Sequence, residues 1–414
     1  MTVHKKFPDG FFWGAATSSF QTEGGIENMD WAQAARDGLV PPIGLACDHY
    51  HRFEADFDIA KSLGHNSHRL SIEWARIEPQ EGKFDEKEIE HYRAVLRALR
   101  ARGLEPFVTL WHFTLPLWFS QSGGFERTDA PEVFARYCAY VVEQLGDLCT
   151  HYSTINEALP YTSNGWRRGT WPPFKKWPFI DRINLPASYR NLAEGKTERS
   201  WKNIAAYFRV LRSLARAHNA AYDGIKKVRP ESEVGIVHHI VLFEANGNPF
   251  NILLAWFANW HWTYHFLAKV EEKCDVFGLN YYLYKKFGDI HVYEKTDMDW
   301  DSYPQGICNA LLMLKRYGKP VYVSEAGIAD AADRMRADYI KQLVRCMHAA
   351  IKKGVDVRGY MYWSLLDNYE LAQGYTKRFG LVEVNFETQE RKIRPSAYVY
   401  KQIIEANALV DPVR

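Results

Sequence analysis

The sequence lacks several features that would place it in particular classes of protein. No uninterrupted apolar run is long enough to span a bilayer. The N-terminal residues MTVHKKFPDGFFWG contain no apolar stretch with a cleavage site, as a secretory signal would. The net charge is only +2 in 414 residues, which gives no electrostatic reason to expect nucleic acid or an anionic membrane as a partner. We expect a cytoplasmic protein with neither kind of partner.

Patterns that form disulfides or bind metals are also missing. The six cysteines are scattered without a CxxC pair, so we expect them to be reduced and buried. The histidines of HYH (49–51) and HH (238–239) suggest the alternative of a metal-dependent hydrolase. Adjacent or alternate histidines seldom form a catalytic metal site without facing carboxylates, and no HExxH motif occurs. We therefore expect neither a metal nor a cofactor.

Aromatic residues, in contrast, are abundant. They make up 15% of the chain, with 14 Trp and 24 Tyr. They could form a large aromatic core, or they could stack on the flat apolar faces of sugar rings. Composition alone favours the core, because large aromatic side chains dominate protein interiors.

A helical pattern that ends at a glycine and is followed by a strand-like run recurs along the chain. It is seen for the predicted helices 53–63, 86–102 and 336–353, which end at Gly64, Gly103 and Gly354. Glycine is the usual residue just after a helix, because it adopts the left-handed conformation easily. Helices that alternate with strands predict βαβ units and a parallel sheet.

Eight strands predict a (β/α)₈ TIM barrel, an α/β fold. They are expected at 11–19, 68–75, 105–112, 151–158, 233–240, 274–282, 320–327 and 357–366. Their near-continuous apolar character fits a sheet that is buried on both faces. No break in composition divides the chain, so we expect residues 1–414 to form one barrel domain. The polar and aromatic stretch 161–200 is expected to form loops over the C-terminal ends of the strands.

Polar residues gather at the C-terminal ends of these strands, where barrel enzymes carry their active sites. One polar strand end would be unremarkable, but seven that converge on one face indicate a site. The residues are Gln21, Arg69, Glu73, His112, Asn156, Glu157, Asn280 to Tyr282, Glu325, Trp363 and Asp367 to Glu370.

Two carboxylates stand out within this set. Glu157 in STINEA and Glu325 in VYVSEAG both close apolar strands, three strands apart around the barrel. This separation predicts that they face each other across the central cleft. Facing carboxylates are what the cleavage of a glycosidic bond requires. The alternative is that each is an ordinary salt-bridge partner.

These motifs resemble those of the family 1 glycoside hydrolases, the β-glucosidase/β-galactosidase family. The resemblance runs from FPDGFFWGAATSSFQTEGG to RFGLVEV and RPSAYVYKQII. STINEA resembles the acid/base motif of the family, VYVSEAG its nucleophile motif, and GYMYWSLLDNYE its signature on the eighth strand. Several motifs in the same order form a specific signal, whereas SEAG alone would be weak.

The resemblance implies a retaining mechanism. Glu325 would attack the anomeric carbon, while Glu157 would protonate the leaving group and then deprotonate water, with the two carboxyl groups about 5–5.5 Å apart. Arg69 matches the arginine beside the nucleophile and would keep Glu325 ionised. The charge of Glu325 would then raise the pKa of Glu157. Tyr282 matches the tyrosine that hydrogen-bonds the nucleophile.

The resemblance also implies residues that bind the sugar. Gln21, His112 and Glu370 match hydroxyl-binding positions, and Asn156 matches the residue that binds the 2-hydroxyl. Trp363 would form the platform under the sugar ring. Asn280 and Leu371 are also expected to bind the substrate. Without the motifs, His112 and Trp363 would be assigned to the core. A carboxylate at Glu370 would repel a phosphate, so we expect an unphosphorylated β-glycoside or short oligosaccharide.

Three residues depart from the family pattern. Leu371 replaces a tryptophan that normally donates its indole N–H to a sugar hydroxyl. Because leucine has no donor, weaker discrimination at the 3- and 4-hydroxyls is expected. Ala158 replaces the usual proline after the acid/base and Ala326 the usual asparagine after the nucleophile. Neither removes a carboxylate, but both are expected to alter loop geometry.

Two tryptophan-rich segments remain, within 161–200 and at 248–262. Trp166, Trp171 and Trp177 are candidates for an aglycone funnel. For 248–262 we expect an amphipathic barrel helix with a buried face, with the lining of that funnel as the alternative.

The sequence thus predicts a retaining exo-β-glycosidase. Glycosyl transfer would pass through a covalent glycosyl-enzyme, with β-glucosides as main substrates and β-galactosides or β-fucosides as side substrates. A transglycosylase of the same family and a catalytically silent sugar-binding barrel remain the alternatives. The sequence gives no indication of an oligomeric state.

Overall fold

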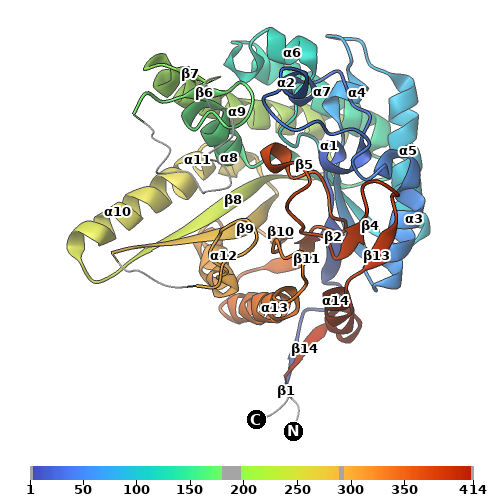
Figure 1. Cartoon of the computed structure of the whole chain (residues 1–414), viewed down its shortest axis with the longest axis vertical. Coiled ribbons are helices and arrows are strands. Elements are labelled where there is room, and N and C mark those ends of the chain that lie inside the picture. Colours follow the sequence, from blue (N-terminus) through green and yellow to red (C-terminus); the bar gives the residue numbers. More distant parts are fainter. Residues whose placement is uncertain (1–2, 180–196, 289–292, 412–414) are drawn as a thin grey trace.

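Eight parallel strands close into a barrel at the centre of the structure, a computed structural model that describes residues 3–179, 197–288 and 293–411 (Figure 1). This confirms the predicted (β/α)₈ barrel. In the order in which they pair, the strands are β2 (Phe12–Ala16), β3 (Ser67–Ser71), β4 (Glu105–Thr109), β5 (His151–Asn156), β8 (Glu233–Ala245), β9 (Val276–Phe287), β10 (Val321–Ala326) and β11 (Val357–Trp363).

Helices surround the barrel (Figure 1). The predicted helices correspond to α3 (His49–Ser62), α5 (Glu86–Ala101) and α13 (Arg336–Lys352). The others are α1 (Ser19–Glu23), α2 (Asp30–Arg36), α4 (Trp74–Ile77), α6 (Leu117–Gln121), α7 (Ala130–Leu145), α8 (Ala158–Thr162), α9 (Lys202–Val228), α10 (Pro249–Asn259), α11 (His265–Leu267), α12 (Ile307–Lys315) and α14 (Pro395–Ala406).

Helix α5 shows why these segments are helical. Asp85 caps its first turn by accepting a hydrogen bond from the backbone N–H of Lys87 (2.9 Å). Its buried residues, which include Ile89, Tyr92, Leu96 and Leu99, recur at the spacing that forms one apolar face. Such a face packs on the barrel and leaves the polar face in water.

Aromatic side chains fill the N-terminal end of the barrel. The ring of Phe107 lies 5.2 Å from that of Phe12 and 4.9 Å from that of Tyr322, with Met361 in the same buried cluster. Because this end is packed, the C-terminal strand ends are the face at which a ligand can meet the barrel.

Short antiparallel pairs complete the chain. β1 (Val3–Lys6) pairs with β14 (Ala408–Asp411), and β12 (Val382–Val384) pairs with β13 (Arg391–Ile393). The β1–β14 pair lies beside both termini, at the bottom of Figure 1. None of the described helices is both long and apolar enough to cross a membrane.

The expected loop stretch 161–200 contains regular elements. Helix α8 continues into a π-helical turn at Ser163–Arg167, and β6 (Lys175–Lys176) pairs with β7 (Glu198–Arg199). Residues 180–196 of this stretch lie outside the described residues.

The expected burial of the segment 248–262 is wrong for its helix α10, where only Ala255 is buried. The cause is the length of β8 and β9, which run past their predicted ends and keep pairing from Leu242 with Tyr284 to Ala245 with Phe287. This two-stranded arm carries α10 away from the barrel wall (Figure 1, left).

Candidate active site

Glu325 lies at the C-terminal end of β10 and is buried. An unpartnered buried carboxylate would be strongly unfavourable. The guanidinium of Arg69, from β3, donates to Oε1 of Glu325, and the hydroxyl of Tyr282, from β9, donates to Oε2 (2.9 Å). Both of the partners that the resemblance implied are therefore in contact with Glu325.

Arg69 is itself buried and held in one orientation. Its Nε donates to the hydroxyl of Thr109 (3.0 Å), and one terminal nitrogen donates to Oδ1 of Asn156 (2.8 Å). The other terminal nitrogen, which contacts Glu325, also donates to the carbonyl of Ser324 (3.3 Å). A single cation thus links the ends of β3, β4, β5 and β10.

Glu157 follows β5 directly and has a left-handed backbone, with φ of 50°. This conformation is uncommon for a residue other than glycine and is found at functional turns. Oε1 of Glu157 accepts a hydrogen bond from the side-chain amide of Asn280 (2.7 Å). Nδ1 of His239 lies 3.3 Å from the same oxygen.

His239 is the functional residue that the sequence analysis missed, because the pair His238–His239 suggested a metal. Successive residues of a strand point to opposite faces of the sheet. Accordingly, His238 hydrogen-bonds the carbonyl of Trp262 (3.1 Å) on the helical side, while His239 points to Glu157. Strand alternation was the signal that could have identified it.

The pKa shifts of the two carboxyl groups run opposite to the expectation. Burial raises the pKa of Glu325; Arg69 opposes this shift, and the charge of Glu157 adds to it. Burial acts on Glu157 in the same direction, but charged His239, with Asn280 and Arg69, lowers its pKa overall. The reason for the difference is His239, whose positive form favours the ionised form of Glu157.

A hydrogen-bonded chain joins the two carboxylate strands. The hydroxyl of Ser324, next to Glu325, donates to the side-chain oxygen of Asn280 (2.8 Å), and Asn280 donates to Glu157. Asn280 also donates to Oδ1 of Asn156 (3.3 Å). Asn280 therefore contacts Glu157, a contact that its grouping with the expected sugar-binding residues did not include.

The residues expected to bind the sugar converge on the same end of the barrel. Nε2 of His112 lies 3.4 Å from the side-chain nitrogen of Asn156, and the rings of His112 and Trp363 are nearly parallel at 5.9 Å. Gln21 accepts from the hydroxyl of Ser18 (2.8 Å) and donates to the carbonyl of Tyr369 (3.0 Å). These contacts hold the polar groups in place before a ligand arrives.

Glu370 is the remaining carboxyl group among the residues expected to bind the sugar. Burial, with the charges of Glu325 and Glu157, raises its pKa to about 8, while a hydrogen bond with Trp363 opposes the shift. Its Oε2 is buried and makes no hydrogen bond to any residue that the structure describes. The neighbouring Leu371 is buried and has a left-handed φ of 48°. Glu370 is thus a neutral acid near pH 7, able to donate or accept a hydrogen bond.

Two other polar residues of the predicted set have structural partners. Glu73 accepts hydrogen bonds from the hydroxyls of Ser19 (3.1 Å) and Thr114 (3.0 Å) and caps α4. Asp367 pairs with Arg394 through both of its oxygens (2.9 Å each). They support the site rather than line it.

The histidines of the HYH motif each pair with a single aspartate. His49 contacts Asp56 (2.8 Å) and His51 contacts Asp48 (2.7 Å). Across residues 3–179, 197–288 and 293–411, no three side chains of the metal-binding types gather in one place.

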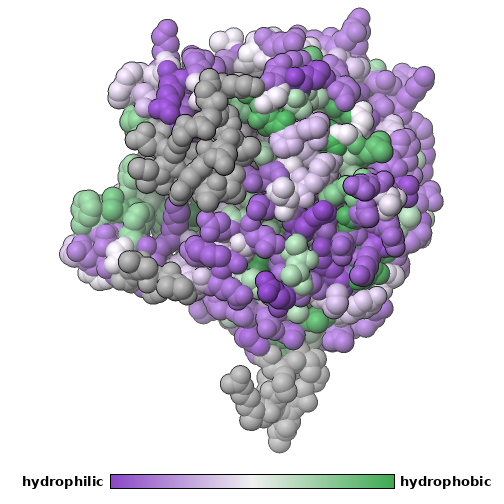
Figure 2. Space-filling model, viewed as in Figure 1, coloured by the Kyte–Doolittle hydropathy of each residue, from purple (hydrophilic) through white to green (hydrophobic). Residues whose placement is uncertain are grey.

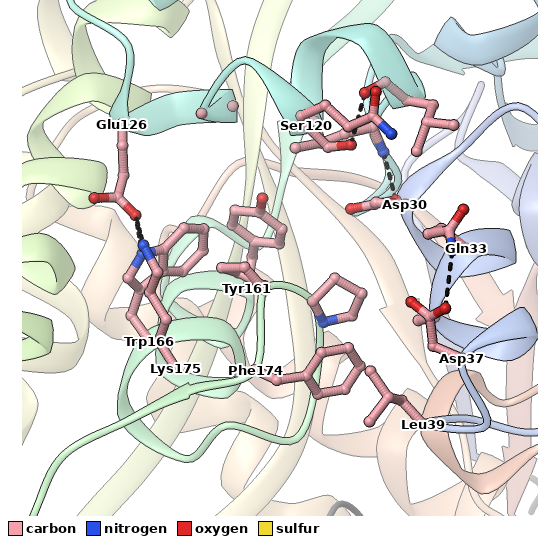
Figure 3. A pocket seen from close by; sticks show the side chains of 18 residues that line it. Asp30, Gln33, Asp37, Leu39, Ser120, Glu126, Tyr161, Trp166, Phe174 and Lys175 are labelled. Carbon is pink, nitrogen blue, oxygen red and sulfur yellow. Dashed lines mark hydrogen bonds and ion pairs between the residues drawn. The ribbon is translucent and has the colours of Figure 1, made fainter. Parts of the chain in front are cut away.

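A separate cavity of about 280 Å³ lies between α2, α6 and the segment that follows β5 (Figure 3). Trp166 and Phe174 contribute to its apolar wall. Burial raises the pKa of Asp30 in this wall to about 8, although two backbone N–H groups donate to it. Trp166 is fixed there by its indole N–H, which donates to Glu126 (2.8 Å).

The other two funnel candidates also make packing contacts. Trp171 is buried with its ring 5.7 Å from Trp31 and 4.8 Å from Phe113. Trp177 is half-buried, 5.5 Å from the ring of Tyr207. Their part in an aglycone funnel stays a prediction.

Known proteins resemble this chain over nearly its whole length. The sequence profile of Glycosyl hydrolase family 1 matches residues 3–271 and 284–409. β-Glucosidase A of Acetivibrio thermocellus is 31% identical, over 97% of this chain and 98% of its own length.

Two solved structures show the likeness in three dimensions. A β-glycosidase from Pyrococcus horikoshii has a TM-score of 0.87 at 34% identity, over 99% of this chain and 97% of that one. The β-glucosidase from Thermotoga maritima in complex with glucoimidazole has a TM-score of 0.86 at 29% identity, over 98% and 100%. From the profile match and the relative of 31% identity, each over nearly the whole chain, we conclude that the chain belongs to glycosyl hydrolase family 1 and is a glycoside hydrolase.

Proposed function

We propose that this glycoside hydrolase is a retaining exo-β-glycosidase that acts on unphosphorylated β-glycosides, with β-glucosides as main substrates. The observation that carries the proposal is the pairing of each carboxylate with its own set of partners. Arg69 and Tyr282 hold Glu325, while Asn280 and His239 hold Glu157. Such asymmetric surroundings suit two carboxyl groups with different roles.

In the first step, ionised Glu325 attacks the anomeric carbon. The bond to the leaving oxygen breaks as Glu157 transfers its proton to that oxygen, and a glycosyl ester of Glu325 forms. Arg69 favours the ionised form of Glu325 that this step needs, and Tyr282 directs its other oxygen.

In the second step, water attacks the same carbon from the opposite side. Ionised Glu157 takes its proton, and Glu325 leaves as a carboxylate. Because the configuration inverts twice, the product keeps the β configuration. Once Glu325 is an ester it no longer repels the charge of Glu157, which favours the basic form of Glu157 at this stage.

The sugar would be bound by Gln21, His112, Asn156 and Glu370, over the ring of Trp363. The neutral form of Glu370 near pH 7 refines the argument against a phosphorylated sugar. A phosphate dianion beside Glu370 would face an uncharged acid, and the carboxyl groups of Glu325 and Glu157 interact with Glu370 electrostatically and would disfavour a further negative charge. We therefore propose an uncharged glycone, with β-galactosides and β-fucosides as slower substrates.

A panel of nitrophenyl β-glycosides tests the proposal. It would contain gluco, galacto, fuco, manno, xylo, glucurono and 6-phosphogalacto sugars. For the best substrate, NMR would show which anomer of the sugar is released first. We expect the β anomer to appear first; early release of the α anomer would disprove the retaining mechanism.

Trapping with a 2-fluoro glycoside tests the role of Glu325 directly. We expect a peptide that contains Glu325 to gain the mass of one sugar, and the Glu325→Gln variant to gain none. Binding of the sugars without turnover or labelling would instead favour a silent sugar-binding barrel. An alcohol added as acceptor would measure how far transglycosylation competes with hydrolysis.

A further inference from the structure

Helix α10 and the residue after it form an unusual apolar surface. The helix contains no charged residue. Seven large apolar side chains on this stretch are 36–66% exposed: Phe250, Ile252, Leu253, Leu254, Trp256, Phe257 and Trp260. They form the apolar projection at the left edge of Figure 2, where Figure 1 places α10. At about 200 Å² for a fully exposed side chain of this size, they present roughly 700 Å², more than the ~300–600 Å² of the largest patch on a typical monomer.

The distribution of these side chains around the helix indicates what covers them. At 100° per residue, the positions from Ile252 to Leu254 span about 200° of the circumference. A helix that packs on a protein surface usually carries an apolar stripe of about 100°. A helix that is apolar around most of its circumference belongs in an apolar medium, and α10 has only Ala255 buried in its own protein.

The helix is nevertheless firmly attached on its polar side. The side chain of Asn248 caps its first turn by accepting from the N–H of Phe250 (2.9 Å). The side chain of Asn259 bonds both backbone groups of Phe243 on β8, accepting from the N–H (3.3 Å) and donating to the carbonyl (2.7 Å). Asparagines thus fix the helix to the β8–β9 arm, which leaves the apolar side facing outward.

A cationic surface adjoins the apolar one. On α9, the hydroxyl of Tyr207 lies 3.1 Å from Nε2 of His261, and the exposed ring of Phe208 lies 6.2 Å from the ring of His261, one residue beyond Trp260. Residues 199–222 contain five cations and no Asp or Glu: Arg199, Lys202, Arg209, Arg212 and Arg216. Two of them pair with carboxylates outside this segment, Arg209 with Glu126 (3.2 Å) and Arg216 with Glu132 (3.8 Å). Arg212 makes no ion pair with a carboxylate of the described residues, and its Nε donates to the carbonyl of Phe208 (3.3 Å).

We propose that α10 and the adjoining face of α9 form a docking surface for an anionic lipid bilayer. The Trp, Phe and Leu side chains of α10 would enter the boundary between headgroups and acyl chains, and the cations of α9 would face the headgroups. Apolar and aromatic side chains beside Lys and Arg are the composition of helices that lie in the membrane interface. The small net charge of the whole chain hides this local excess of positive charge.

A second copy of the chain fits this surface less well. A two-fold contact brings the same patch of both molecules together, so the two cationic faces would meet each other. A flat contact between two copies would also cover only one side of a helix whose apolar arc spans about 200°.

Flotation with vesicles tests the proposal on the full chain. We expect binding to vesicles of phosphatidylcholine and phosphatidylglycerol (3:1), weakened by added salt, and weaker binding to phosphatidylcholine alone. In the variant Trp256→Ser/Phe257→Ser, partitioning should fall about tenfold for each side chain replaced. The matched control Leu45→Ser/Tyr398→Ser changes exposed apolar residues elsewhere and should bind as the parent does.

A second variant separates the two parts of the surface. Lys202→Gln/Arg212→Gln should lose affinity for the anionic vesicles and most of the salt dependence, while binding to neutral vesicles stays unchanged. Turnover of a soluble nitrophenyl glycoside should be unaffected in every variant, which would show that the fold is intact.

Three outcomes would overturn the proposal. One is that the protein is a monomer by light scattering and does not bind the vesicles. Another is a dimer that dissociates in Trp256→Ser/Phe257→Ser without any binding to vesicles, which would assign the surface to a second copy. The third is an equal loss of binding in the control variant.

Discussion

Nδ1 of His239 lies 3.3 Å from Oε1 of Glu157, so the imidazole and the carboxyl group can share one proton. Charged His239 beside ionised Glu157 holds the same number of protons as neutral His239 beside protonated Glu157. A change of pH therefore does not interconvert the two forms. Only the second form has the proton where a leaving group needs it.

The variant His239→Asn should place this proton on Glu157, because asparagine can form a hydrogen bond but cannot be protonated. We expect kcat/KM to rise on the neutral plateau. The alkaline limb should move to lower pH, since the proton loses one of its two sites. His238→Asn, which changes the opposite face of β8, is the control. An alkaline limb that stays in place would show that His239 only packs against Glu157.

Arg69→Met should remove the cation that keeps Glu325 ionised. Arg69 lowers the pKa of Glu325, so its loss raises that pKa further. Because Glu325 must be ionised to attack, the acid limb of kcat/KM should move to higher pH. Loss of one partner of a buried ion pair should also lower the free energy of unfolding by about 3–5 kcal/mol.

The control for this variant is Arg97→Met, which removes the cation of the exposed Arg97–Glu90 pair. It should change the free energy of unfolding by less than about 1 kcal/mol. An unchanged acid limb in Arg69→Met, in protein that is still folded, would contradict the proposed role.

Glu370→Gln should make the folded protein more stable near neutral pH while it lowers activity. The folded protein keeps a proton on Glu370 up to a pKa of about 8, whereas the unfolded chain loses it near its ordinary value of 4.5. Stability therefore falls as pH rises between these values, and the variant avoids this loss. The gain should be near zero at pH 4 and about 3 kcal/mol at pH 7.

Urea unfolding at pH 4, 5, 7 and 8 measures this difference, with the exposed Glu383→Gln as the control. A gain that does not depend on pH would argue against a raised pKa. Unchanged activity would remove Glu370 from the site.

Leu371→Trp should change the choice between sugars. Restoring an indole N–H would add one hydrogen-bond donor, so the ratio of glucoside to galactoside turnover should change about threefold to tenfold, the effect of one neutral hydrogen bond. Leu371→Phe provides an aromatic ring without a donor and separates size from hydrogen bonding. The same ratio of glucoside to galactoside turnover in the parent protein and in both variants would mean that residue 371 does not contribute to sugar specificity.

The barrel could be predicted from the sequence because a glycine follows three of the predicted helices and polar residues end seven of the eight predicted strands. Gly64, Gly103 and Gly354 indeed have positive φ, as the pattern required. The ends of β8 and β9 could not be predicted, since their pairing beyond the barrel depends on two distant segments meeting. For the same reason the exposure of α10 was not foreseen.

The contacts of Glu325 could be predicted where a motif named the residue. Arg69 and Tyr282 contact Glu325 as expected, and Asn156 joins Arg69. The direction of the pKa shifts was not predictable in this way, because it depends on His239, which comes from a strand whose motif was not recognised.

The pairing of β8 with β9, which resumes after a register shift between Ile240 and Leu242, makes the arm a spacer of fixed length. His239 and Ala245 are six residues apart on one strand, or about 20 Å at 3.3 Å per residue. The length of the two strands therefore sets the distance of Glu157 and Glu325 from any surface that α10 contacts. Removing two residues from each strand would bring helix and site about 7 Å closer and leave every side chain on its present face.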